Sequence, residues 1–361
     1  MILLIVLCSI YLLQQREELI AYTLKQSKYP ISCDATQPDW LIKLVPLLKS
    51  QGYIGVQISY THQQGTLNCS IGWASLWPLR DLQNNDQFKY ASLSKIFTAA
   101  LVLDLVKKKQ LNLDDQLFTT LDLPLVQHSQ IMDIQITHLL QHRAGFDRRV
   151  SGDWVFEKPN LCPQNLQHLA HYQLDFLPNT QFAYSNFGYC LLGEVIAKKY
   201  QTPLKDIYQQ QLFQPAKAKI SHIADHQGTV EYFDFFKMTS DSLNYPHFTA
   251  YGGFVGTAQD FSKVLDFIQQ QNYFEAALKF KPNSCRLDQW TGCHSLMMYQ
   301  YQSLPSQRVY WRDGSLPGLT ALTMLFEDGR SIVFLANYRG EDVNEGQKQL
   351  RSTLYALLGG D

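Results

Sequence analysis

Strand-like patterns lie near both ends of this 361-residue chain, and helical patterns lie between them. Residues 54–60 alternate between apolar and polar side chains, as a strand with one buried face does, and a similar run follows a turn near 63–65. The C-terminal part returns to strand-like runs at 309–311, 319–326 and 331–336. From 96 to 106, apolar side chains instead recur at every third or fourth position, which is typical of a helix. The chain is therefore predicted to be an α+β domain whose two ends complete one antiparallel sheet.

The predicted domain covers residues 41–358 and has a sheet lobe and an inserted helical lobe. Helical patterns at 41–48 and 343–358 flank the sheet, and 254–268 is predicted to be a further helix. The predicted boundaries are 14–40 for a linker, 41–90 and 250–358 for the sheet lobe, and 91–249 for the helical lobe. A cleft between the lobes is the expected place for a catalytic site.

Residues 1–13 form a nearly unbroken apolar run that ends in a polar stretch. The run is short for a membrane span, but it has the length of the apolar region of a signal peptide. No Lys or Arg precedes it and no small-residue cleavage site follows it, so it is interpreted as an uncleaved signal or membrane anchor. A buried N-terminal helix is the alternative. The protein is expected to be exported, and either periplasmic or anchored to the membrane by this segment.

Six of the seven cysteines lie outside the apolar run. An even number permits disulfides in an oxidising compartment, and Cys285 and Cys293 are close enough in sequence to form a short loop. Buried free thiols are an equally open alternative, because pairing cannot be deduced from sequence alone.

Charge and spacing exclude several classes of site. Lys and Arg total 31 while Asp and Glu total 32, and this net charge of -1 gives no basic stripe for nucleic acid. No Cys or His cluster has the spacing of a zinc site. His138 and His142 lie one helical turn apart but lack a third ligand nearby, so packing or capping roles are expected for them.

Ser92 and Lys95 are the candidate catalytic pair, because they stand three residues apart at the start of a helical pattern. A serine hydroxyl is a poor nucleophile at neutral pH and needs a base within hydrogen-bond reach. Residues three apart on a helix share a face, so Lys95 is well placed to be that base. For this motif alone, the alternative is an N-cap serine followed by a solvated lysine.

Further motifs accompany Ser92-x-x-Lys95 along the chain. They are Gln110–Asp115, Ile136–Gly145, Tyr184-Ser185-Asn186, Gly252-Gly253 and Arg312-Asp313-Gly314-Ser315-Leu316-Pro317-Gly318. With this set in this order, the chain resembles the serine beta-lactamase and penicillin-binding-protein superfamily over roughly residues 40–355, in the branch with a tyrosine in the second motif. That branch holds class C beta-lactamases, D-alanyl-D-alanine carboxypeptidases, D-aminopeptidases and related esterases. The resemblance implies a beta-lactamase/transpeptidase-like fold.

The resemblance also implies a role for each motif residue. Ser92 would be the nucleophile, Lys95 the base, and Tyr184 the group that relays protons to the leaving group and from water. Asn186 would bind the substrate amide and help to hold Lys95. The backbone N–H groups of Ser92 and Ser315 would form the oxyanion hole. The implied reaction is acyl transfer in two steps, with no metal or organic cofactor.

Arg312 departs from the family pattern, which usually has Lys or His at this position. Arginine stays charged and cannot shuttle a proton, so Arg312 is assigned to substrate binding, either through a carboxylate or as a fixed charge. An ion pair with Asp313 or another acidic neighbour is the alternative. Asp313 stands where lactamases have a hydroxyl that contacts the drug carboxylate, so its charge should oppose beta-lactam hydrolysis. Asn179 replaces a usual glycine, and Asn tolerates left-handed backbone conformations.

The predicted function is hydrolysis of an ester, or of an amide or peptide of a D-amino acid, by a serine hydrolase related to beta-lactamases. True beta-lactamase activity ranks below these. The alternative from another class is a penicillin-binding-like protein with weak turnover that acts as a binding or regulatory module. Arg312 is the residue that keeps this alternative open.

Overall fold

The structure is a computed structural model, which describes residue 23 and residues 26–126, 129–153, 161–233, 245–282, 285–303, 307–340 and 342–359. Residues 1–13, which were predicted to form a signal or anchor, lie outside this set. Among the described residues, no helix has both the length and the apolar character needed to cross a membrane.

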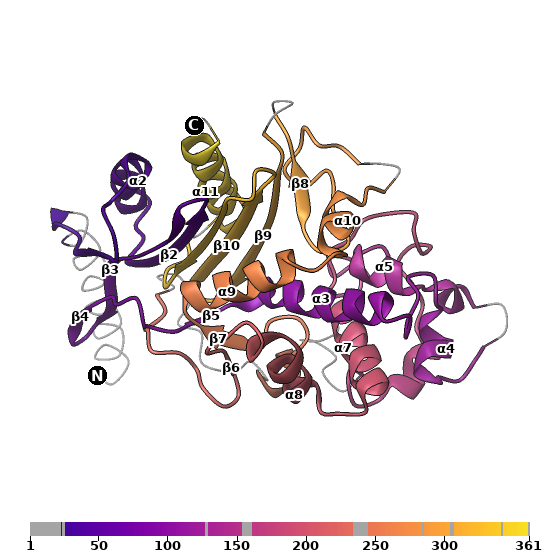
Figure 1. The fold of residues 1–361 in the computed structure, drawn as a ribbon. Coiled ribbons are helices and arrows are strands. Elements are labelled where there is room, and N and C mark those ends of the chain that lie inside the picture. The colour runs from indigo at the N-terminus through magenta and orange to yellow at the C-terminus, as the bar shows by residue number, and fades with distance from the viewer. Residues whose placement is uncertain are drawn as a thin grey trace, which may run out of the picture.

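An antiparallel sheet forms one lobe, and its strands come from both ends of the chain (Figure 1). In spatial order, the strands are β1 (Ile31–Cys33), β3 (Gly65–Leu76), β2 (Gly55–His62), β11 (Ser331–Ala336), β10 (Leu319–Phe326), β9 (Val309–Leu316) and β8 (Tyr299–Tyr301), and β4 (Leu79–Asp81) pairs with β3. The two ends of the chain meet where β2 pairs with β11, with Ile58 opposite Phe334. The prediction of one antiparallel sheet completed by both ends is confirmed.

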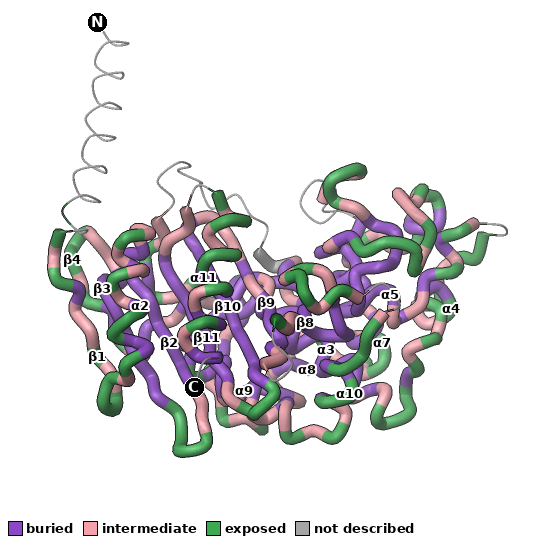
Figure 2. Tube along the Cα trace, turned by 90° about the horizontal axis from the view of Figure 1, so that it is seen from above, coloured by how far each residue is buried: buried purple, intermediate pink, exposed green. Residues whose placement is uncertain are grey.

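Helices cover both faces of this sheet. Successive side chains of a strand point to opposite faces, so a strand that is apolar throughout needs packing partners on both. α2 (Asp39–Ser50) and α11 (Val343–Leu358) lie on one face, and α9 (Ala258–Gln269) packs on the other against β2 and β11 (Figure 1). In β11, Phe334 joins the apolar core under α2 and α11, whereas its neighbour Val333 joins the core shared with α9 and the helical lobe. The central strands are accordingly buried on both sides (Figure 2).

The helical lobe is built around α3 (Ser94–Lys107), whose residues are almost all buried. Its other helices are α4 (Leu117–Leu121), α5 (Ile136–Leu140), α7 (Asn186–Tyr200), α8 (Leu204–Tyr208), short 3₁₀ helices at Gln130–Asp133 and Leu166–His171, and a π-helical turn at Gln209–Phe213. A small sheet of β5 (Phe88–Lys89), β7 (Phe254–Gly256) and β6 (Ser221–His222) pairs segments of the two lobes. The remaining helices are α10 (Phe274–Lys279) and a 3₁₀ helix at Tyr245–Phe248.

Two predicted boundaries were wrong. The expected linker 14–40 contains β1, which is part of the sheet and is followed by Asp34, whose carboxylate accepts hydrogen bonds from the backbone and side chain of Asn68. The expected helix 254–268 begins with strand β7, and α9 starts only after Thr257, whose hydroxyl caps the helix by accepting from Asp260 N–H. Both strands have only three residues, too few to show a period of two.

The six described cysteines form three disulfides, Cys33–Cys69, Cys162–Cys190 and Cys285–Cys293. Of the two alternatives that the sequence left open, disulfides are therefore present rather than free thiols, and one of them closes the short loop between Cys285 and Cys293. The first bridge joins β1 to β3, and the second joins Cys190 of α7 to Cys162, which lies shortly before the 3₁₀ helix at Leu166–His171. The third bridge closes a loop beside the cleft.

Candidate active site

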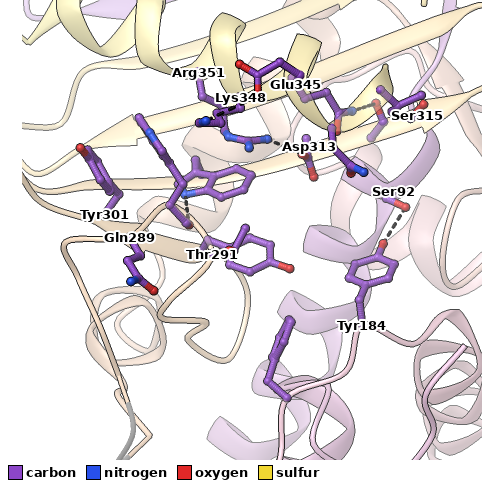
Figure 3. Close-up of a pocket in the computed structure, with 18 of the residues that line it drawn as sticks. Ser92, Tyr184, Gln289, Thr291, Tyr301, Asp313, Ser315, Glu345, Lys348 and Arg351 are labelled. Atoms are coloured by element: carbon purple, nitrogen blue, oxygen red, sulfur yellow. Dashed lines mark hydrogen bonds and ion pairs between the residues drawn. The ribbon is translucent and has the colours of Figure 1, made fainter. Parts of the chain in front are cut away.

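A cavity of about 860 Å³ lies between the two lobes, and Ser92 is on its wall (Figure 3). Its other walls come from the loop around Arg148, the segment that ends at Tyr184, the loop around Trp290, β9 and the first half of α11. The expected cleft between the lobes is present, and the candidate nucleophile faces it.

The backbone around Ser92 is held in an unusual conformation. Ser92 lies in the 3₁₀ turn Ala91–Leu93, and α3 starts two residues later, at Ser94. Ala91 has a φ of 47°, a left-handed conformation that costs energy for a residue with a side chain. Strand β9 packs directly against this turn: a Cβ on Gly314 would lie 2.9 Å from Tyr90 O and 3.0 Å from Ser92 N. Only glycine at 314 permits this close approach.

Ser92 Oγ is at the centre of a cluster of three side chains. Lys95 Nζ donates to it at 3.0 Å. Tyr184 OH also donates to it, at 2.7 Å (Figure 3). Lys95 is fully buried, and its ammonium also donates to the carbonyl of Tyr251 at 2.7 Å. The structure therefore brings together the three residues that the sequence assigned to catalysis, although Tyr184 is 92 residues from Ser92.

Burial and charge favour the neutral form of Lys95. Burial lowers the pKa of Lys95 well below its usual value, and the Arg312 and Arg148 cations lower it further against the opposing charges of Asp153 and Asp313. Neutral Lys95 has a lone pair on Nζ, so in this state Ser92 Oγ can donate the hydrogen bond and Lys95 Nζ can accept it. Burial raises the pKa of Tyr184, although Arg312 opposes this, so the phenol keeps its proton at neutral pH. Lys95 is therefore the candidate base and Tyr184 a proton donor.

Arg312 is buried beneath this cluster, with 1% of its surface exposed, and it does not line the cavity. Its guanidinium donates to Ser92 O at 3.0 Å, to Met297 O at 2.9 Å and to His294 Nε2 at 3.3 Å. Because Arg312 does not line the cavity, its position favours the fixed charge of its two predicted roles, and contact with a substrate carboxylate stays a prediction. The alternative of an ion pair with Asp313 is wrong, since Asp313 pairs with Arg351 at 2.7 Å. Arg312 is a fixed buried charge.

Two neutral histidines complete the surroundings of Arg312. His294 Nδ1 donates to Ser295 O, which leaves Nε2 free to accept from Arg312, and burial lowers the pKa of His294 to about 3. His142 Nδ1 accepts from Ser185 N–H, and its Nε2 lies 3.3 Å from a guanidinium nitrogen of Arg312. Burial, then His294 and Arg312, lower the pKa of His142 well below its usual value. Arg312 is thus the cation of this cluster, and both imidazoles stay neutral beside it.

The comparison with known proteins agrees with this geometry. A family model described as Beta-lactamase matches residues 43–355. The chain belongs to the beta-lactamase family. A relative named "Probable fimbrial assembly protein FimD, serogroup H1" from Dichelobacter nodosus is 28% identical, over 92% of this chain and 87% of the relative. Penicillin-binding protein 4* from Bacillus subtilis is 23% identical, over 80% and 69%.

Solved structures confirm the predicted fold. D-amino acid amidase from Ochrobactrum anthropi superposes with a TM-score of 0.71 and 20% identity, and the match covers 86% of this chain and 94% of the amidase. D-alanine carboxypeptidase AmpC from Burkholderia cenocepacia superposes with a TM-score of 0.69 and 17% identity, covering 89% and 98%. At these identities, the likeness shows a shared fold of helices and antiparallel sheet.

In this member of the beta-lactamase family, Asn186 is turned toward a residue that the sequence did not single out. Asn186 is the first residue of α7, and its side-chain nitrogen donates to Asp153 Oδ2 at 2.7 Å. Among the described residues, Lys95 donates hydrogen bonds to Ser92 and Tyr251, and no hydrogen bond joins it to Asn186. The Ser185 hydroxyl caps α7 by accepting from Gly188 N–H. Asp153 is far from any motif, so only the fold reveals it.

On β9, Asp313 and Ser315 line the cavity beside Ser92 (Figure 3). Asp313 Oδ2 is held by Arg351 of α11, which also lies over the Trp311 ring at 4.1 Å. The Ser315 hydroxyl oxygen is buried and has no hydrogen-bond partner among the residues that the structure describes. The oxyanion role of the Ser92 and Ser315 backbone N–H groups stays a prediction.

His138 caps α5 by accepting from Gln135 N–H, which confirms a capping role. No cluster of three metal-binding side chains occurs among the described residues.

Proposed function

We propose that this chain is a serine hydrolase that cleaves an ester or amide through an acyl-Ser92 intermediate. The observation that carries the proposal is the position of Ser92 Oγ, 3.0 Å from Lys95 Nζ and 2.7 Å from Tyr184 OH. A nucleophile, a base of lowered pKa and a proton donor, all within hydrogen-bond reach on a cavity wall, are the groups that acyl transfer needs.

Each half of the reaction uses the same groups. Neutral Lys95 takes the proton of Ser92 while Oγ bonds to the substrate carbonyl carbon. The carbonyl oxygen becomes an oxyanion, and the N–H groups of Ser92 and Ser315 are the proposed donors to it. The ester or amide bond then breaks as Tyr184 gives its proton to the leaving oxygen or nitrogen and regains one from Lys95. Water next attacks the acyl carbon as neutral Lys95 takes its proton. The bond between the acyl carbon and Oγ then breaks, and the proton passes from Lys95 to Ser92 Oγ, directly or through the Tyr184 hydroxyl.

The proposed substrates carry no carboxylate next to the scissile bond. Asp313 puts a carboxylate on the wall beside Ser92, and in the described part of the chain Arg351 pairs with Oδ2 alone of its two oxygens. A substrate carboxylate at that wall would be repelled, whereas a neutral ester or an amine-bearing amide would not. D-amino acid amidase, one of the structural neighbours, supports the amide as a substrate class.

The substrate proposal is tested by Asp313→Asn, which removes the charge and keeps the shape. We expect kcat/KM for a chromogenic cephalosporin and for a D-Ala-D-Ala peptide to rise relative to kcat/KM for p-nitrophenyl acetate. An unchanged ratio for both would show that the Asp313 charge does not select the substrate.

We propose that the protein is exported, either to the periplasm or to a membrane-tethered position. Three disulfides support an oxidising compartment, because such bonds are rare in proteins kept in the reducing cytosol. The apolar run 1–13 is the proposed signal or tether.

Labelling with a serine-directed fluorophosphonate tests the hydrolase mechanism. We expect one adduct, located by peptide mapping on Ser92 and absent from Ser92→Ala. Ser94→Ala is the matched control, because Ser94 is a buried serine two residues away and its loss should leave labelling intact. An adduct that persists in Ser92→Ala, or none in the wild type, would refute the mechanism.

A binding or regulatory role with weak turnover is the second candidate. It is favoured by the names of two Dichelobacter nodosus relatives, both called fimbrial assembly proteins. Steady-state hydrolysis of p-nitrophenyl acetate separates the two functions, because a module with weak turnover would react at Ser92 but release product slowly, whereas the proposed hydrolase releases it repeatedly.

A further inference from the structure

A second, smaller cavity of about 160 Å³ adjoins the cavity that Ser92 faces, because Phe182 and Thr291 line both of them. Gln141, Arg143 and His294 are among the residues that line this small cavity. One water needs only about 10–15 Å³ of such space, so the small cavity has room for a ligand of several heavy atoms. Its lining therefore shows which chemistry that ligand needs.

A left-handed turn at the end of α5 brings Gln141 and Arg143 to the small cavity. His142 has a φ of 57°, and its side chain lies against Arg312, whereas the residues on either side of it line the small cavity. The turn is closed by Arg143 N–H, which donates to His138 O at 2.7 Å. Gln141 is 4% exposed and Arg143 is 8% exposed, so two buried polar side chains share this wall.

The side-chain amide of Gln141 lacks a hydrogen-bond partner. Its Nε2 is buried and donates to no group in the described part of the chain. A buried donor that is left unpaired destabilises the folded state, and nearly all buried donors in proteins have an acceptor. Since Gln141 lines a cavity, the missing acceptor is expected to be a molecule or ion held there.

Arg143 gives the small cavity a positive charge that no described carboxylate balances. Its Nε donates to Asn179 Oδ1 at 3.2 Å and its Nη2 to Asn179 O at 2.8 Å, and both of these acceptors are neutral. Within the described ranges, Nη1 donates to no residue and no Asp or Glu forms an ion pair with Arg143. Of the described residues that line the cavity, none is acidic and His294 is neutral, so the wall carries one net positive charge.

We propose that the small cavity binds a small monovalent carboxylate, of the size of formate or acetate, between Gln141 and Arg143. A carboxylate has two oxygens, so one can accept from the Gln141 amide while the other accepts from the Arg143 guanidinium. Its single negative charge balances the single cation of the wall, and a buried charge is stable only when it is paired. The inference does not depend on the proposed hydrolase activity.

Thermal unfolding of the full chain in sodium acetate tests the proposal. A ligand that binds only the folded state raises the melting temperature, and we expect a rise of about 2 °C or more in the wild type at saturating acetate. Gln141→Leu should lose this rise. Without acetate it should melt at the wild-type temperature or above, because it no longer buries an unpaired amide. Sodium sulfate stabilises proteins by exclusion from their surface, so its effect on the two proteins should be equal.

Ser59→Ala is the matched control for the loss of an unpaired polar group. Ser59 of β2 is fully buried, its hydroxyl has no partner among the described residues, and it does not line the small cavity. This variant should keep the response to acetate. An equal acetate response in wild type and Gln141→Leu, or no response in the wild type, would overturn the proposal.

Saturation-transfer NMR on the acetate methyl group measures binding independently of stability. Gln141→Leu should bind acetate about tenfold more weakly or worse than the wild type, because a hydrogen bond to a charged ligand is lost. Acetate bound equally by both proteins would place it elsewhere, and no binding to the wild type would mean that the small cavity takes up no carboxylate. Either result contradicts the proposal.

Discussion

Replacing Arg312 by methionine tests whether the buried guanidinium keeps Lys95 neutral. The pKa of Lys95 is lowered first by burial and next by Arg312. Catalysis as proposed needs the neutral amine, so kcat/KM should rise with pH through the pKa of Lys95. Without the Arg312 charge that pKa rises, and the ascending limb of the pH profile should move to higher pH.

The size of the effect follows from the positions of the two cations over Tyr184. Lys95 Nζ lies 5.0 Å from the centre of the Tyr184 ring and Arg312 Cζ lies 5.8 Å from it, so the two charges are at most about 11 Å apart. At an effective dielectric constant of about 20, repulsion at that distance is about 1.5 kcal/mol. This corresponds to about a tenfold lower fraction of neutral Lys95 at a fixed pH below its pKa. We therefore expect at least about a tenfold loss of kcat/KM on the ascending limb.

The assay is p-nitrophenyl acetate hydrolysis across pH, with the rate of Ser92→Ala subtracted at each pH. Arg312→Lys is the control, because it keeps the positive charge but cannot make all the hydrogen bonds of the guanidinium. Arg312→Lys should have a lower melting temperature but an ascending limb at the same pH as the wild type. Arg312→Met should shift the ascending limb to higher pH. If Arg312→Met lowers kcat/KM equally at every pH, the arginine only supports the structure and the electrostatic reasoning is refuted.

Three further outcomes are expected. Tyr184→Phe should lower kcat by a factor of about 10²–10⁴ in steady-state assays, and kcat within threefold of wild type would remove Tyr184 from proton transfer. Gly314→Ala puts a Cβ 3.0 Å from Ser92 N, so kcat/KM should fall about tenfold or more, and retention of full activity would contradict the required close approach of β9. Replacing Cys162 and Cys190 by alanine should lower the free energy of unfolding by about 2–4 kcal/mol in urea titrations, and no measurable loss would show that the bridge does not stabilise the lobe.

Local patterns in the sequence were enough to predict most of the fold and the pairing of Ser92 with Lys95. The strands at 319–326 and 331–336 and the helix at 343–358 have the predicted bounds, because each is long enough to show its period. Asn179 has a φ of 65°, the left-handed conformation expected where relatives have glycine. The proximity of Tyr184 to Ser92 came from family resemblance, since no local pattern relates residues 92 positions apart.

The features that the sequence did not reveal depend on contacts between distant segments. Strand β1 exists because β3 and a disulfide hold it, and three residues carry no pattern of their own. Arg312 was assigned to substrate binding from its position in the third motif. A motif shows which residue type is present, but it does not show in which direction the side chain points. Its partners Met297 and His294 precede it by 15 and 18 residues in an irregular segment, so their convergence on Arg312 could be seen only in the fold.

The most direct test of an acyl-Ser92 intermediate is mass spectrometry of the enzyme quenched in acid during turnover of a p-nitrophenyl ester. The mechanism predicts that the protein gains the mass of the acyl group before steady state, that the group maps to Ser92, and that Ser92→Ala gains nothing. Release of p-nitrophenol by an enzyme that carries no acyl group, or an acyl group on another residue, would contradict it.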